Sequence, residues 1–234
     1  MTTEAGLEGL RRRHARSRSG SAAERLTLVP AAEHRRTLVF LHGFQMRARH
    51  LLEDFTRLQE TCPTWRFVLP QAPELPITAH GGQATPSWYD YLTDSAGAGE
   101  DLVDLAGLRV RRVELAALLR AEAALLGDDY SRLYVGGLSQ GGTLALDAAT
   151  RLQLGGVVTV VAPRLSVSLR KALQAPWHGL FARHDSVFPV GWARPLLRDA
   201  VATWCDADHD LEGVDYVGYL ATTLQKFEAP RKDP

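Results

Sequence analysis

Residues 137–142 read Gly-Leu-Ser-Gln-Gly-Gly and place a serine between glycines, in the pattern G-x-S-x-G. An apolar stretch precedes the motif and a helical pattern follows it, which is the context of a nucleophile on a sharp strand-to-helix turn. Flanking glycines remove side chains that would collide with neighbouring backbone, and the helix N-terminus offers N–H groups to an oxyanion. The motif lacks the lysine of a phosphate-binding loop and the spacing of a dinucleotide fold. It therefore predicts acyl transfer to Ser139.

A serine nucleophile needs a general base and an acid, which follow it along the chain in hydrolases with this turn. Asp185 comes directly after the apolar stretch 180–182, at the carboxyl end of an expected strand, where sites in parallel sheets lie. His209 stands in the polar loop 206–212, before the last expected helix. Order and position together predict the catalytic triad Ser139, Asp185 and His209.

Other downstream candidates fit this chemistry less well. Asp199 falls inside an expected helix, and His178 begins an expected strand, so it would lie at the opposite end of the sheet. His184 directly precedes the predicted acid, and neighbouring residues rarely meet in the acid–imidazole geometry. The acidic neighbours of His209, which favour its charged form, are Asp206, Asp208 and Asp210.

An oxyanion needs two backbone donors, one after the nucleophile and one from the loop after an early strand. We predict the N–H groups of Gln140 and Phe44. Phe44 follows Leu-His-Gly at the end of an expected strand, and Gly43 permits the turn. His42 precedes the serine in the chain and is expected to brace the loop.

The composition is that of a globular protein able to position such a site. Of 234 residues, 45% are apolar and 23% charged, which excludes a disordered protein, a fibre and a disulfide scaffold. Basic and acidic side chains number 27 each, so no charge excess favours nucleic acid or anionic membrane. No apolar run reaches the roughly 18 residues of a membrane span. The two cysteines lack metal-binding spacing and indicate a reducing compartment, for which we predict the cytoplasm.

Hydrophobic periodicity predicts alternating strands and helices. Expected strands cover 26–29, 37–41, 65–69, 133–138, 157–161 and 180–182, and expected helices 51–62, 110–126, 142–152, 192–200 and 213–227. Residues 71–99 read as a long loop rich in Pro, Gly and Ser, and 201–205 shows no clean strand pattern. This alternation predicts an α/β fold with a mostly parallel sheet covered on both faces.

The N-terminal residues differ from the rest. Five arginines fall between residues 9 and 20 with no acid among them, and the apolar centre of a signal peptide is missing. We predict a basic, mobile tail over 1–22 and a single domain over 23–230, with organellar targeting by the tail left open. A monomer or a weak dimer is expected.

Several motifs carry a family resemblance over about 36–227. They are Leu-His-Gly at 41–43, Leu-Pro-Gln-Ala-Pro at 69–73, Pro-Ser-Trp-Tyr-Asp at 86–90, the elbow at 137–142 and His-Asp-Ser-Val-Phe-Pro at 184–189. Together they resemble L-H-G, P-x-A-P, P-S-W-[FY]-D, G-F-S-Q-G-G and D-x-x-V-P of the acyl-protein thioesterase and small carboxylesterase family of α/β-hydrolases.

The resemblance implies an α/β-hydrolase fold without a large cap domain, and the same triad. It implies hydrolysis of acylated proteins, lysophospholipids or small acyl esters, with no metal and no organic cofactor. The family's acyl groove is walled partly by the loop matching 75–88, so Leu75, Ile77 and Trp88 become candidate substrate contacts. Ordinary packing beneath a long loop is the alternative for each of them.

Two departures keep other functions open. Phe44-Gln45-Met46 stands where the family has L-G-D, and Phe44-Gln45 resembles the short serine hydrolases of fungi and animals. The stretch from Asp185 to His209 is also shorter than in typical members. The alternatives are a short-chain carboxylesterase without a protein substrate, and a catalytically silent hydrolase fold that binds acyl groups or a partner.

Overall fold

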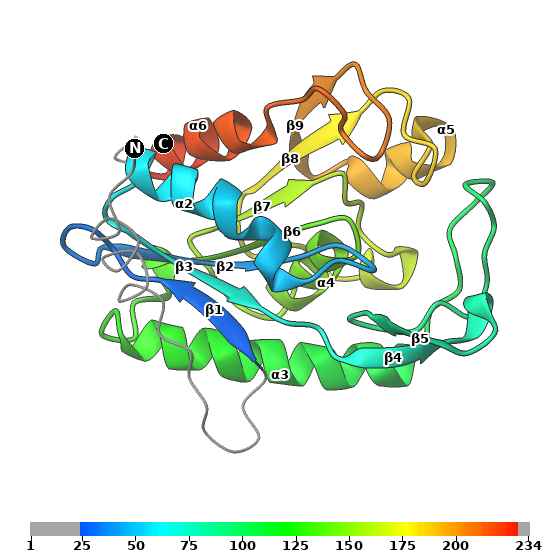
Figure 1. Cartoon of the computed structure of the whole chain (residues 1–234), viewed down its shortest axis with the longest axis horizontal. Helices are drawn as coiled ribbons and strands as arrows, with labels where there is room; N and C mark the ends of the chain where they lie inside the picture. The colour runs from blue at the N-terminus through cyan, green and yellow to red at the C-terminus, as the bar shows by residue number, and fades with distance from the viewer. Residues whose placement is uncertain (1–23, 229–234) are drawn as a thin grey trace, which may run out of the picture.

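A central sheet forms the middle layer of the computed structural model, which describes residues 24–228 (Figure 1). In this part of the chain the sheet has seven strands. Their spatial order is β1 (Arg25–Leu28), β3 (Trp65–Pro70), β2 (Arg36–Leu41), β6 (Leu133–Leu138), β7 (Gly156–Val160), β8 (Trp177–Ala182) and β9 (Ala200–Cys205). Strand β1 pairs antiparallel with β3, and every other neighbouring pair is parallel. The predicted, mostly parallel sheet is confirmed, whereas the tail predicted at 1–22 lies outside the described residues.

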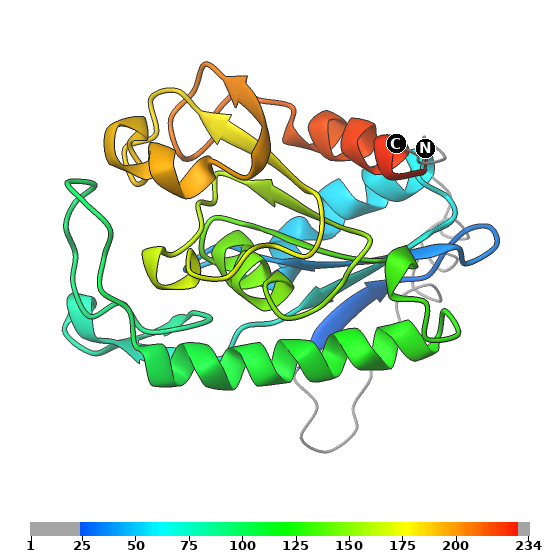
Figure 2. The ribbon, with the colours of Figure 1, turned by 180° about the vertical axis from the view of Figure 1, so that it is seen from behind.

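Helices cover both faces of the sheet, as Figure 2 shows from behind. Helices α2 (Leu52–Thr61) and α6 (Tyr216–Glu228) pack on one face, and α3 (Leu105–Ala124) and α4 (Gln140–Ala149) on the other. Each face has its own apolar cluster. Strands β2, β6 and β7 are almost wholly buried. Because helices cover both faces of the sheet, such strands are apolar along most of their length.

Short elements fill the connections. They are η1 (Ala48–Leu51), η2 (Thr78–His80), η3 (Tyr130–Arg132), η4 (Ser166–Ser168), α5 (Val190–Ala193) and η5 (Arg194–Leu197). Helix α3 begins five residues earlier than its periodicity predicts, because the Asp104 carboxylate caps it and accepts the N–H groups of Ala106 and Gly107 at 2.9 Å. Among the described helices, none is long and apolar enough to cross a bilayer.

Two elements near the C-terminus differ from what the sequence pattern indicated. Residues 201–205 lack an apolar alternation, yet they lie in strand β9, which pairs with β8 from Trp177↔Ala200 onward. Because β9 is an edge strand, Val201 is exposed and the strand needs no apolar pattern. The helix expected at 192–200 is reduced to α5 and η5, since Ala200 already belongs to β9.

The loop expected at 71–99 contains a hairpin that its sequence did not indicate. Strands β4 (Glu74–Ile77) and β5 (Gln83–Pro86) pair antiparallel and form a separate two-stranded sheet. Prolines at positions 76 and 86 of the chain mask a strand pattern, because proline is tolerated only at edges and strand ends. The hairpin turns the chain back toward the carboxyl ends of the central strands (Figure 1).

Candidate active site

Ser139 occupies a strained turn between β6 and α4. Its φ of 49° and ψ of −122° are rarely adopted by a residue with a side chain, and its carbonyl accepts the Thr143 N–H at 3.0 Å. A side-chain carbon on Gly137 would lie 2.5 Å from the Gly141 carbonyl carbon, so only glycine permits so sharp a turn. The geometry is that of the predicted elbow, and Ser139 remains 8% exposed.

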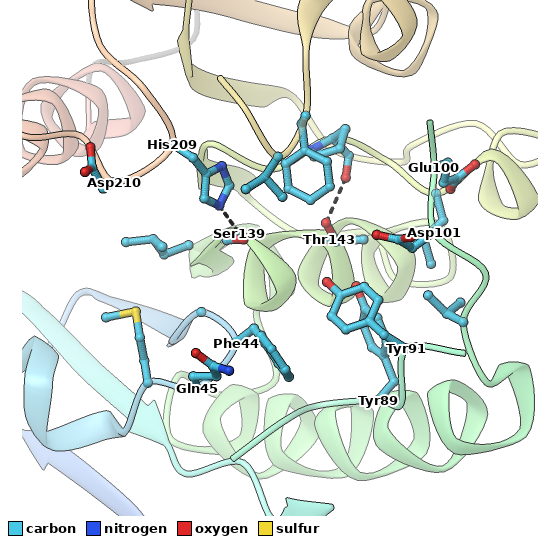
Figure 3. A pocket seen from close by; sticks show the side chains of 18 of the residues that line it. Phe44, Gln45, Tyr89, Tyr91, Glu100, Asp101, Ser139, Thr143, His209 and Asp210 are labelled. Atoms are coloured by element: carbon cyan, nitrogen blue, oxygen red, sulfur yellow. Dashed lines mark hydrogen bonds between the residues drawn. The ribbon is translucent and has the colours of Figure 1, made fainter. Parts of the chain in front are cut away.

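Asp185, His209 and Ser139 form a continuous hydrogen-bond chain. His209 Nε2 lies 2.9 Å from Ser139 Oγ (Figure 3). His209 Nδ1 lies 3.0 Å from both carboxylate oxygens of Asp185. A carboxylate only accepts hydrogen bonds, so Nδ1 carries the hydrogen and Nε2 is left to accept the serine hydroxyl. The structure thus brings together the three side chains that the sequence singled out.

Backbone donors hold the Asp185 carboxylate in place. The N–H groups of Val187 and Phe188 donate to its Oδ1 at 3.0 and 2.6 Å. The carboxylate is almost buried, and the Phe188 ring packs edge-on against the His209 imidazole, 5.3 Å between centroids. The loop after β8 therefore fixes the Asp185 carboxylate and packs against one side of the His209 ring.

Asp208 connects the loop that carries Asp185 with the loop that carries His209. Its Oδ1 accepts the N–H groups of His209 and Ser186 at 2.6 and 2.7 Å, and these hydrogen bonds hold the pKa of this exposed carboxyl below its usual value. Asp208 therefore joins two backbone segments, whereas the hydrogen bonds of the His209 ring go to Asp185 and Ser139.

The other acids and histidines considered from sequence lie away from the triad. Asp206 bonds His184 at 2.7 Å on the exposed surface. His178 packs against the Phe227 ring, at the amino end of β8 and away from Ser139. Asp199 pairs with the buried Arg164.

Both backbone groups predicted to bind the oxyanion are free. Phe44 follows β2 in the turn that Met46 N–H closes onto the Gly43 carbonyl at 3.3 Å, and Gln140 is the first residue of α4. Within residues 24–228, no protein atom accepts a hydrogen bond from the N–H of Phe44 or Gln140. Unpartnered N–H groups beside a serine are what an oxyanion requires.

His42 supports this turn from inside the protein. Its Nε2 accepts the Ala72 N–H at 3.0 Å, and its Nδ1 lies 2.8 Å from the Gly43 carbonyl oxygen. Burial lowers the pKa of His42 to about 4, so the ring is neutral at pH 7 and can accept the Ala72 hydrogen bond. This contact agrees with the bracing role expected of His42.

Ser139 opens onto a cavity of about 640 Å³. Figure 3 shows Asp210 beyond His209 on one side of the serine, and Tyr89, Tyr91, Glu100 and Asp101 on the other. The apolar lining residues include Leu138, Leu165, Val187, Phe188, Leu196 and Val214. Burial raises the pKa of Tyr91 far above its usual value, so its hydroxyl stays neutral. The side facing Tyr91 is therefore polar as well as aromatic.

The predicted substrate contacts Leu75, Ile77 and Trp88 lie elsewhere, and that prediction needs correction. None of the three lines the Ser139 cavity. Ile77 is fully buried, Leu75 is half-buried on the hairpin, and the Trp88 indole turns inward and donates to the His42 carbonyl at 2.8 Å. The hairpin places this segment behind the oxyanion turn, so packing, the alternative left open for these residues, describes them better.

Residues that do line the cavity were missed. Tyr91 comes from the second half of the loop expected at 71–99, and Glu100 and Asp101 directly follow that loop. The only sequence signal there is the aromatic alternation Tyr89, Tyr91. Within the described residues, neither Glu100 nor Asp101 has an ion-pair partner. Within residues 24–228, no group of three or more metal-binding side chains is placed to hold an ion.

The parallel sheet, the strained serine at the end of β6, and an acid and a histidine after β8 and β9 define an α/β-hydrolase fold. The sequence model of the phospholipase/carboxylesterase family matches residues 24–206. The chain belongs to this family. The matched stretch ends before His209, whose contact with Ser139 is seen in the structure.

Relatives and solved structures agree with this assignment. Acyl-protein thioesterase 1 of Neurospora crassa is 32% identical over 157 residues, which cover 64% of this chain and 63% of the relative. Acyl-protein thioesterase 1 of Yarrowia lipolytica is 30% identical over 139 residues, covering 56% and 58%. The chain spans about three fifths of the length of the curated relatives it matches.

Solved structures share the fold at low sequence identity. Acyl-protein thioesterase 2 of Zea mays superposes with a TM-score of 0.69 at 18% identity, over 88% of this chain and 100% of that one. A carboxylesterase of Bacillus cereus gives a TM-score of 0.69 at 15% identity, over 89% and 96%. The predicted fold and family resemblance are confirmed.

Proposed function

We propose that this protein is a serine hydrolase that cleaves acyl thioesters or carboxylic esters, with Ser139 as nucleophile, His209 as base and Asp185 as acid. The hydrogen-bond chain through these three side chains, at the mouth of a 640 Å³ cavity, carries the proposal. Family membership and the named relatives support acyl-protein thioesters and carboxylic esters as substrate classes.

The mechanism follows from the contacts. His209 Nε2 removes the Ser139 proton as Oγ attacks the acyl carbon, and the N–H groups of Phe44 and Gln140 stabilise the oxyanion. The imidazolium then protonates the departing thiolate or alkoxide, which frees the acyl-enzyme for attack by water. Asp185 orients the ring and stabilises its charged form throughout.

The position of His209 also orients the substrate. The leaving group must lie within reach of Nε2, on the side of Ser139 where Figure 3 shows Asp210. The acyl group then extends to the other side, past Tyr89 and Tyr91 toward Asp101. An acylated protein would place its thiol leaving group on the side of Asp210.

A short-chain carboxylesterase is the second candidate, and the lining of the acyl side favours it. Glu100 and Asp101 are carboxylates without ion-pair partners among the described residues, and a long methylene chain gains little against charged groups. The Leu75, Ile77 and Trp88 side chains, which the resemblance offered as an apolar wall, do not line this cavity.

Matched esters and thioesters of increasing acyl length separate the two candidates. In a thioesterase for long chains, each buried methylene adds up to ~0.8 kcal/mol of transition-state binding, so kcat/KM rises by one or more powers of ten between acetate and medium chains. In a short-chain esterase, acetate or butyrate is best. A folded protein that hydrolyses none of them and is not labelled by a fluorophosphonate would be a silent binding module.

For its location we propose the cytoplasm. Both cysteines are free, Cys62 buried and Cys205 half-buried, which fits a reducing compartment. If the protein were found in an oxidising compartment with both thiols modified, the proposed cytoplasmic location would be contradicted.

A further inference from the structure

The segment 86–89, called the brace segment from here on, lies against both loops that carry the predicted oxyanion donors. We propose that it is a positioning element that fixes the N–H groups of Phe44 and Gln140 for the transition state, with Trp88 as its central residue. The proposal rests on the proposed hydrolase function, because an oxyanion forms only if acyl transfer occurs.

On one side the brace segment holds the turn that carries Phe44. The Pro86 carbonyl accepts the Gln45 N–H at 3.0 Å, and the Trp88 indole N–H donates to the His42 carbonyl at 2.8 Å. Gln45 has a φ of +62°, in the left-handed region that residues with side chains rarely adopt. Such a turn persists when surrounding contacts hold it. The residues on both sides of Gly43 and Phe44 are therefore tied to the brace segment.

On the other side the brace segment holds the start of α4. The Gln140 side chain is fully buried; its Oε1 accepts the Trp88 N–H at 3.0 Å, and its Nε2 donates to the Tyr89 carbonyl at 3.0 Å. The Ser87 hydroxyl adds a partner 2.9 Å from Nε2. Gln140 thus carries one oxyanion donor on its backbone and is fixed by its own amide side chain.

The two loops also touch each other directly. A side-chain carbon on Gly141 would lie 2.4 Å from the His42 carbonyl oxygen, the atom that accepts the Trp88 indole hydrogen bond. The same carbonyl therefore contacts the brace segment and the elbow at once. Loss of the indole hydrogen bond leaves this carbonyl without its donor and frees the turn to shift, which moves Phe44 N–H relative to Gln140 N–H.

Trp88 is a positioning residue because it contacts no part of the Ser139 cavity. It lines a different cavity of about 740 Å³, together with residues of α3 and the ends of β3 and β4. We therefore expect Trp88 to affect turnover through the oxyanion donors. Removing one such donor lowers kcat by about a hundred- to a thousandfold, and a misplacement of about 1 Å has a cost of similar order.

The test compares Trp88→Phe with Trp177→Phe in the full chain. Both changes delete a buried indole N–H with a 2.8 Å hydrogen bond and keep an aromatic ring, but Trp177 donates to Thr159 Oγ1 at the amino end of β8. We expect Trp88→Phe to lower kcat by about ten- to a hundredfold with KM within about twofold, equally for acetate and longer acyl groups. Trp177→Phe should lose similar thermal stability and keep kcat within about twofold.

The affinity for a mimic of the tetrahedral intermediate is a second measurement, which a loss of packing alone would not change. The affinity for a trifluoromethyl ketone, whose bound oxyanion needs both N–H groups, should fall in Trp88→Phe by the same factor as kcat. Equal kcat values for the two variants, or a loss confined to KM or to long acyl chains, would overturn the positioning role. If the parent protein shows no hydrolysis and no fluorophosphonate labelling, the proposed function is overturned and this proposal with it. If the parent is active and Trp88→Phe keeps the parent's kcat, only the positioning role is overturned.

Discussion

Two regions approach the Ser139 cavity and contribute to it in different ways. The loops after β6, β8 and β9 each present one side chain, and these side chains bond one another within 3.0 Å. The brace segment presents no side chain to the cavity at Ser139 apart from Tyr89, and it bonds carbonyl, N–H and amide groups of the loops beside it. We propose that one region carries proton transfer and that the other holds the backbone donors.

The difference predicts how each region responds to mutation. A side chain that moves a proton has no substitute, because its pKa and geometry belong to that residue type. A hydrogen-bonding support can be weakened in steps, since several contacts share the task. Substitutions among the triad should therefore abolish turnover, whereas substitutions around it should scale turnover down.

Ser139→Ala should show the largest effect. Removal of the nucleophile is expected to lower kcat for a soluble ester by at least about a thousandfold, up to about a millionfold, because the triad acts as a unit. Steady-state kinetics measure the loss, and a thermal unfolding curve matching the parent shows that the fold is intact. Turnover above a tenth of the parent value would remove Ser139 from the mechanism.

Asp185→Asn and Asp208→Asn form a matched pair at neighbouring acids. Asp185 must accept the His209 Nδ1 hydrogen, so the amide favours the wrong tautomer and kcat should fall by about a thousand- to ten-thousandfold. Asp208 only accepts two backbone N–H groups, which an asparagine oxygen also does, so kcat should stay within about threefold. The opposite ranking in kinetic assays would exchange the two assignments.

The acidic side of the cavity offers a smaller, selective effect. Asp101→Asn should raise kcat/KM for medium-chain esters by about three- to tenfold, because an uncharged lining accepts methylenes more readily. Acetate esters, whose acyl group is too short to meet Asp101, serve as the internal reference and should change less than about twofold. A uniform change for all acyl lengths would show that the acyl group does not extend to this side.

The smallest effect concerns stability rather than turnover. The folded pKa of His42, about 4, lies below the unfolded value of 6.5, so the unfolded state binds the proton first as pH falls. The contribution of His42 to the free energy of unfolding is therefore present above pH 6.5 and is lost as the pH falls. Between pH 7 and pH 5 this loss should lower the free energy of unfolding by about 2 kcal/mol. Denaturant titrations of the parent and His42→Gln measure the contribution. Burial also lowers the pKa of the less buried His34 and His178, but both remain in the two proteins and contribute equally to each. If the unfolding free energy of the parent and of His42→Gln changed equally with pH, the contribution of His42 would be contradicted.

The parts predictable from sequence are those that local sterics dictate. Glycines around Ser139 permit the tight turn of the elbow, and the apolar stretch 133–138 before this turn indicates a buried strand, so local residue types indicate both. Chain order and the carboxyl ends of strands then limit the acid and base to Asp185 and His209.

The parts that sequence did not predict depend on contacts between distant segments. Strand β9 exists because β8 offers it an edge, and its own residues carry no apolar pattern. Trp88 looks like a substrate contact in sequence, but the β4–β5 hairpin turns its indole toward His42, 46 residues away in the chain. Such pairings are set by packing across the fold, which periodicity does not encode.

The nucleophile itself is tested most directly by covalent labelling. The folded parent is incubated with a fluorophosphonate, and the modified residue is identified by mass spectrometry of its peptides. We expect one adduct per chain, on Ser139, with labelling slowed in Asp185→Asn and absent in Ser139→Ala. An adduct on a different residue, or no adduct on folded protein, would contradict the assignment of this site as the centre of acyl transfer.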